Sequence, residues 1–287
     1  MNEKNLDYLK TQLKYLGFGD KLSEVLRSAL LANSGDFPLS LKTTPNPYRF
    51  RPKDVELPLA NETMRYNLQF KQGSETNIHF LNNMHAALFT PGSEPVARQF
   101  NPDSAYHVTA MDAYNLLSGR FVEKKINLQP AQEGGAAETK TLWLGLDLEV
   151  TNHRGQHPFK TFHEQYGYDL EKTVARYQAT GFESAKEAEA RLQALRKGHL
   201  VATTIPLAKK QTPVWVAANP ERGLNVYHLA TMKPIHNFDI FPEMKKAYEE
   251  KRAAELAATA EAAASEALAP DLDPVAQAQG RSKGARR

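Results

Sequence analysis

Leu142-Trp143-Leu144 and Val214-Trp215-Val216 hold the only two tryptophans of the 287-residue chain, and the sequence around them matches. Upstream of each lies a helix-like stretch that ends in glycine and leads into an apolar run: Gly119-Arg120-Phe121-Val122 and Gly198-His199-Leu200-Val201. Downstream of each lies an Arg-Gly turn, with Phe159 or Tyr227 four positions after the glycine. Internal repetition fixes architecture before chemistry, so we predict a duplicated unit of helix, strand, strand, turn and strand.

The composition is ordinary for a globular protein, with 41% hydrophobic and 24% charged residues. The 36 basic and 33 acidic residues nearly balance, so net charge argues neither for nor against nucleic acid. The absence of cysteine excludes disulfides, thiolate zinc sites and cysteine nucleophiles. No apolar run approaches the roughly 18 residues of a membrane span, and the polar N-terminus is unlike a signal peptide. We expect a cytoplasmic protein without membrane contact.

Five regions follow from the pattern along the chain. Leucines at helical spacing indicate an N-terminal hairpin of two helices, and five closely spaced prolines indicate an extended linker or strap. An Ala/Glu/Lys-rich stretch near the end has helical propensity but little to bury, so we expect it to project. The predicted regions are 1–35 (helical hairpin), 36–60 (Pro-rich linker), 61–236 (duplicated body), 237–268 (projecting helix) and 269–287 (disordered, basic-ended tail).

The predicted fold class is α+β, built from antiparallel β-hairpins with capped helices packed on them. Thr109 followed by Asp112, and Ser184 followed by Glu187, resemble capping boxes that open the helix of each repeat. Asp20 and Asp169 are predicted to cap the second helix of the N-terminal hairpin and a short helix between the repeats. The helical hairpin and the C-terminal helix flank the duplicated unit. Whether the two repeats share one sheet is left open.

Aromatic and basic residues near the repeats are candidates for binding a partner or nucleic acid. Positive charges beside exposed aromatic rings suit a phosphate backbone with stacked bases. The alternative is a helix C-terminus whose cations complement its dipole, with both tryptophans in the core. Trp143 is out of phase with the leucines beside it, so we expect it to point away from their face. The candidates are Trp143, Arg191, Arg196, Lys197, His199, Lys209, Lys210, Trp215 and Tyr227.

His153, His157 and His163, with Glu164, form the best metal-like set in the sequence. Histidine and carboxylate are competent zinc ligands. However, the six residues from His157 to His163 span roughly 20 Å of extended strand, which is too far for one ion. Histidines on the surface of a hairpin are the simpler interpretation, and we expect no metal or other cofactor.

Four segments resemble a family of uncharacterised bacterial proteins carried on conjugative and other mobile genetic elements. They are 5–19, the helix end Asn115-Leu116-Leu117-Ser118-Gly119-Arg120, the run 163–170 and Ala218-Asn219-Pro220. The resemblance spans roughly residues 5–250. It implies a setting, DNA mobility, and supplies no catalytic residues.

Two functions of different classes remain. The first is a non-enzymatic interaction or accessory protein in mobile-element or conjugative DNA processing, which binds a protein partner, DNA or both. The second is a metal-dependent hydrolase that uses the histidines and Glu164. We favour the first, because every catalytic candidate has a simpler structural explanation.

Overall fold

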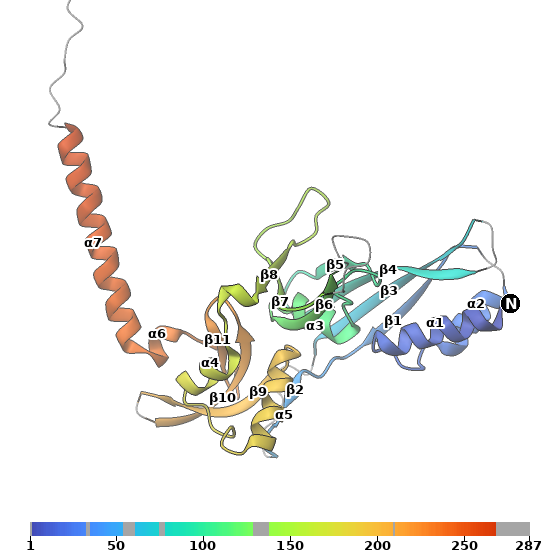
Figure 1. The fold of residues 1–287 in the computed structure, drawn as a ribbon, viewed down its shortest axis with the longest axis horizontal. Helices are drawn as coiled ribbons and strands as arrows, with labels where there is room; N and C mark the ends of the chain where they lie inside the picture. The colour runs from blue at the N-terminus through green and yellow to red at the C-terminus, as the bar shows by residue number, and fades with distance from the viewer. Residues whose placement is uncertain are drawn as a thin grey trace, which may run out of the picture. The chain divides into compact units, whose positions relative to one another are not determined.

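A computed structural model describes residues 2–32, 35–53, 61–74, 78–128, 138–208 and 210–267 (Figure 1). The chain divides into two compact units, Met1–His236 and Asn237–Arg287. The first unit contains three mixed or antiparallel sheets with helices packed on them, which confirms the predicted α+β class.

A four-stranded antiparallel sheet forms the N-terminal part of the first unit, in the order β1-β3-β4-β5. One face of this sheet is buried under helices α1 and α2, which contact β4 and β1 (Figure 1). The element bounds are α1 Glu3–Tyr15, α2 Ser23–Leu31, β1 Phe37–Thr43, β3 Thr63–Gln72, β4 His79–Phe89 and β5 Val96–Phe100.

The predicted helical hairpin is confirmed. Leu6, Leu9 and Leu13 of α1 are buried in the core, as their spacing predicts. Gly17 follows α1 with φ +90°, a conformation that glycine adopts without strain. The expectation that Asp20 caps α2 is wrong, because the capping position is Leu22 and no side chain caps this helix.

The Pro-rich region is not simply a linker. Residues Phe37–Thr43 form β1, and Pro38 fits there because β1 lies at the edge of the sheet, where a missing N–H is tolerated. Tyr48–Arg49 form β2, which pairs in parallel with a strand of the second repeat and so acts as a strap. The end of the predicted linker, 54–60, lies outside the described residues.

Both repeats have the predicted order of one helix and three strands. The first consists of α3 Ala110–Leu117, β6 Val122–Leu128, β7 Glu138–Leu146 and β8 Phe159–His163. The second consists of α5 Ala185–Arg196, β9 Leu200–Leu207, β10 Lys210–Asn219 and β11 Gly223–His228. The pairing registers correspond: Trp143 lies opposite Glu123, and Trp215 lies opposite Ala202, the position that matches Glu123 in the sequence alignment of the repeats.

The repeats build separate sheets, which answers the question that the sequence leaves open. The first sheet has the order β6-β7-β8; the second has the order β12-β11-β10-β9-β2, with β12 at Pro234–Ile235. The 3-10 helix η1, Glu164–Tyr166, and helix α4, Leu170–Arg176, connect the repeats. Asp169 caps α4 by accepting a hydrogen bond from the Lys172 N–H, as predicted.

The third strands of the repeats begin differently. In the second repeat, three residues separate β10 from β11, whereas residues 147–158 separate β7 from β8. The Arg154-Gly155 pair lies within this longer loop. As a result Phe162, and not Phe159, lies opposite Trp143 in the position that Tyr227 takes opposite Trp215.

Helices α3 and α5 end in the same way, and the repeats meet at these ends. After each helix a glycine takes a positive φ, and the next N–H, of Arg120 or His199, bonds back to the carbonyl of Asn115 or Ala194. Asn115 Nδ2 donates to the Lys197 carbonyl at 2.7 Å, and Arg120 Nε donates to the Gly198 carbonyl at 3.0 Å. We call this junction the repeat seam.

Thr109 and Ser184 cap the two repeat helices as predicted, but only α3 has the full capping box. Thr109 and Asp112 form a reciprocal capping box on α3, and the Ser184 hydroxyl accepts from the Glu187 N–H on α5. Each cap satisfies a backbone donor that the helix leaves unpaired. These caps therefore fix where each repeat begins.

The second unit consists of two helices in its described part, α6 Asn237–Ile240 and α7 Pro242–Ala267. It begins at the predicted boundary. Phe238 packs on Tyr248 with ring centroids 5.4 Å apart, and Lys246 and Glu250, one helical turn apart, form an ion pair at 3.9 Å. The predicted tail, 269–287, lies outside the described residues. Among the residues that are described, no helix has the length and apolar character to cross a membrane.

The repeat seam predicts that substitution by alanine destabilises the protein by different amounts at two equivalent glycines, Gly119 and Gly198. A Cβ at Gly198 would lie 2.8 Å from the Phe121 carbonyl oxygen and 2.8 Å from Val122 Cγ1, whereas one at Gly119 would lie 3.5 Å from Leu148 Cδ1. Both residues have positive φ, so Gly119→Ala is expected to cost about 1 kcal/mol and Gly198→Ala about 3 kcal/mol or more, as measured by urea unfolding. Equal costs at the two positions would contradict the close approach at the seam.

Candidate binding groove

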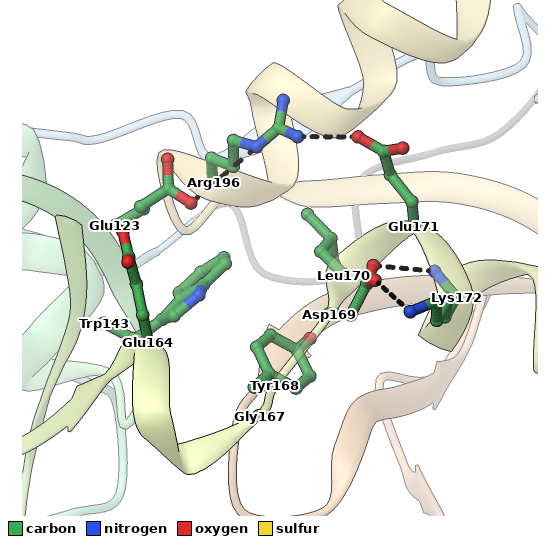
Figure 2. A pocket seen from close by; sticks show the side chains of 10 residues that line it. All are labelled: Glu123, Trp143, Glu164, Gly167, Tyr168, Asp169, Leu170, Glu171, Lys172 and Arg196. Atoms are coloured by element: carbon green, nitrogen blue, oxygen red, sulfur yellow. Dashed lines mark hydrogen bonds and ion pairs between the residues drawn. The ribbon is translucent and has the colours of Figure 1, made fainter.

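A groove lies between the first repeat, the connection between the repeats and helix α5 of the second repeat (Figure 2). It consists of two adjoining hollows of about 450 and 530 Å³. Both are lined by Glu123, Trp143, Glu164, Tyr168 and Arg196. The elements around the groove are therefore β6 and β7 of the first repeat, the connection that contains η1 and α4, and α5 of the second repeat.

Aromatic rings form the floor of the groove. Trp143 is 6% exposed and lies on the face of β7 opposite to Leu142 and Leu144, which are in the main core, as its phase in the sequence predicts. The ring of Tyr168 meets Trp143 edge to face, with centroids 5.4 Å apart. The Tyr168 hydroxyl donates to the Gly223 carbonyl of β11 at 2.9 Å. Tyr168 thus joins the floor of the groove to the second repeat.

Arg196, near the end of α5, ties the walls of the groove together. Its guanidinium lies 3.8 Å from Glu123 of β6, 3.1 Å from Glu171 of α4 and 3.6 Å from Glu189 of α5 (Figure 2 shows the first two pairs). Burial raises the pKa of Glu123, and the positive charges of Arg196 and Lys125 oppose this rise. Arg196 therefore opposes the protonation that burial favours at this half-buried carboxyl group, where the repeats face each other.

Carboxylates outnumber cations along the described lining of the groove. The carboxylates are Glu123, Glu164, Asp169, Glu171 and Glu189; the cations are Lys125, Lys172 and Arg196. Glu164 is exposed and has no ion-pair partner among the described residues, and Figure 2 shows it on the side of the groove next to Glu123. The groove is therefore an acidic hollow with an aromatic floor.

The second tryptophan has a different setting. Trp215 is fully buried, its indole N–H donates to the Leu229 carbonyl at 3.0 Å, and the ring of Tyr48 from β2 lies 4.8 Å from it. Tyr227, opposite Trp215, is half-buried, and burial raises its pKa. The hypothesis of an exposed aromatic surface is therefore wrong for both tryptophans: Trp215 is fully buried, and Trp143 is 6% exposed and borders the groove only with its edge.

The predicted basic candidates do not form one patch. Arg191 donates to the Ala202 carbonyl and lies over the Phe50 ring, and Arg196 is occupied by carboxylates. Lys197 and Lys210 are exposed, but they lie at opposite ends of β9, whose eight residues span roughly 25 Å. Lys209 is outside the described residues. A partner-binding role for Lys197 and Lys210 stays a prediction.

His199 is a buried seam residue and not a surface cation. It is 6% exposed, its Nε2 lies 3.4 Å from the guanidinium of Arg49, and its Nδ1 has no hydrogen-bond partner among the described residues. Burial lowers the pKa of His199 to about 4, and the charges of Arg49, Arg120 and Lys197 add to this effect, while Asp112 opposes it. The imidazole is therefore neutral in the folded protein at physiological pH.

The metal-like set is not assembled. His157 Nδ1 lies 2.9 Å from the Val150 carbonyl, His163 lies in β8 opposite Leu142, and His153 is in the loop between β7 and β8. No group of three or more histidine or acidic residues in the described part of the chain is placed to hold a metal ion.

Trp143 and Arg196 were predicted from the sequence, whereas Tyr168 and the acidic residues that line the groove were missed. One signal was present in the repeat itself: Glu123 stands where the second copy has Ala202, directly opposite the tryptophan. A charged residue at a position that is apolar in the other copy marks where the two copies have different surroundings. Glu171 and Glu189 gave no such signal, since acidic residues on a helix surface are common.

Comparison of the chain with protein-family models, curated proteins and solved structures finds no match.

The neutral state of His199 predicts a pH dependence of stability. The unfolded chain takes up a proton near pH 6.5, whereas the folded protein does so only near pH 4, so stability is full above this window and falls as the pH decreases through it. Between pH 6.5 and about pH 5, the free energy of unfolding in urea should fall by about 2 kcal/mol more for the wild type than for His199→Gln. The same substitution at the exposed His228 is the control; a wild-type curve parallel to that of His199→Gln would show that the buried imidazole is not responsible.

Proposed function

We propose that the protein is a non-enzymatic interaction protein whose groove binds a basic segment of a partner protein. The observation that carries the proposal is the excess of carboxylates around the aromatic floor that Trp143 forms. A lysine or arginine side chain places its apolar stem on aromatic rings and its charge next to carboxylates. Both features are present within the same hollow.

A comparison of the repeats supports a role for this groove in binding. In the second copy the chain covers its own tryptophan, because Tyr48 of β2 packs on Trp215. In the first copy the matching face borders the groove instead. Tyr48 therefore covers Trp215 within the chain, whereas Trp143 in the first repeat lies next to an open hollow.

Charge favours protein over nucleic acid at this site. A phosphate backbone would meet Glu164 and Glu171 at the walls, and like charges brought together cost binding energy. The resemblance to proteins of mobile elements supports the further proposal that the partner belongs to a DNA-processing assembly, in which this protein is an accessory component.

The proposal predicts opposite effects for two kinds of change in the groove. Glu164→Gln combined with Glu189→Gln removes two negative charges and should weaken binding of a labelled oligoarginine peptide about fivefold in fluorescence anisotropy. Arg196→Gln frees Glu123, Glu171 and Glu189 from their internal cation and should strengthen binding of the same peptide, with circular dichroism showing that the variant is folded.

The matched control removes two exposed carboxylates elsewhere in the same unit, Glu3→Gln with Glu24→Gln on α1 and α2. This variant should bind the peptide as the wild type does. The proposal fails if the peptide does not bind, if the control weakens binding as much as the groove variant does, or if Arg196→Gln lowers the affinity.

A further inference from the structure

The outer face of the four-stranded sheet carries no negative charge. Strands β1, β3, β4 and β5 contain no aspartate or glutamate at any position, although a quarter of the chain is charged. Their inner face packs on the helices, so the outer face is the one that is open. Because these strands contain no acidic residue, all side chains that they place on the open face are neutral or positively charged.

Cations and amides occupy this face in aligned rows. Lys42 pairs with Arg65 across β1 and β3, and both side chains are exposed. In the next row Asn67 lies between Ser40 and His85, and Asn67 Nδ2 donates to the Ser40 hydroxyl at 3.2 Å. All of these side chains stand on the same face, because residues two apart along a strand share a face.

Two aromatic rings lie among these polar groups. Phe89 is half-buried and has the guanidinium of Arg65 4.4 Å above its ring. Phe80 lies opposite the exposed Lys71 and is 50% exposed, so part of its ring is accessible to a ligand. A shallow hollow of about 510 Å³ opens over this face and is lined by Lys42, Arg65, His85 and Phe89.

From this arrangement we propose that the outer face of the sheet binds single-stranded nucleic acid. Lysine and arginine contact phosphates, exposed rings stack on unpaired bases, and asparagine and glutamine side chains reach base edges. A sheet face with aromatic and basic residues is a common way to hold unstacked bases, whereas a duplex hides the faces of its bases. The occupant is therefore a single strand, bound across the strands of the sheet.

This surface is separate from the groove and goes beyond the proposed docking of a protein. The groove lies on the repeats, and its excess of carboxylates opposes phosphate; the sheet belongs to the N-terminal part of the first unit and lacks carboxylates. Either site can fail its test without affecting the other.

The test is the binding of a labelled thymidine oligonucleotide of about ten residues, as DNA and as the corresponding RNA, to the full chain in fluorescence anisotropy. Three neutralised phosphates, at Lys42, Arg65 and Lys71, predict a slope of about −2 in log affinity against log salt. Lys42→Gln with Arg65→Gln should lower affinity about tenfold or more and reduce the slope by about 1.4. Phe80→Ala, at a half-exposed position that leaves the core intact, should lower affinity about tenfold.

The control is Lys14→Gln with Arg27→Gln, an equal change of charge on the exposed sides of α1 and α2, which cover the opposite face of the same sheet. It should keep the affinity of the wild type apart from a small long-range effect. The inference is overturned if neither oligonucleotide binds at low salt, if the control loses as much affinity as the sheet variant, or if a duplex of the same length binds as tightly as the single strand.

Discussion

The close approach of the two repeats at Gly198 is the constraint on which the rest of the first unit depends. No Cβ fits there, and the carbonyls of Lys197 and Gly198 accept hydrogen bonds from Asn115 and Arg120. Buried polar groups are costly unless paired, so these bonds fix one arrangement of the repeats over others of similar packing. That arrangement sets α5 against β6, places Arg196 beside Glu123 and so determines the width and charge of the groove.

The repeats show how one structural plan takes two roles. Their tryptophans occupy the same register, yet the residue opposite each differs: alanine beside Trp215, glutamate beside Trp143. The alanine leaves room for Tyr48 to pack on the indole, and the ring becomes core. The glutamate brings a charge that pairs with Arg196, and the face borders a hollow. The two copies thus differ in whether the indole is fully enclosed or lies at the edge of a groove.

Local signals carried most of what the sequence predicted correctly. Caps at Thr109, Asp169 and Ser184, the leucine spacing of α1 and the repeat itself rest on contacts between near neighbours in the chain. Apart from the cap expected at Asp20, the errors have a common physical origin, because they depend on pairing between distant segments. Strand β1 was taken for part of a linker because its proline, Pro38, is tolerated only at the edge of a sheet. The acidic residues of the groove were missed because they come from four different elements, β6, η1, α4 and α5. The open sheet face was also missed, because the absence of acidic residues from four separate strands becomes visible only when their register is known.

The strap formed by Tyr48 and Arg49 affects the order in which parts of the protein can fold during synthesis. These residues emerge during synthesis about 150 positions before the histidine beside them, an interval of roughly 10 to 30 s at ordinary translation rates. Until the C-terminal repeat is synthesised, Tyr48 cannot pack on Trp215, and β2 has no partner strand β9. Closure of so long a loop is slow relative to the formation of hairpins. The C-terminal repeat therefore depends on a distant segment of the chain, because without β2 it would expose Trp215, the largest side chain of its interior.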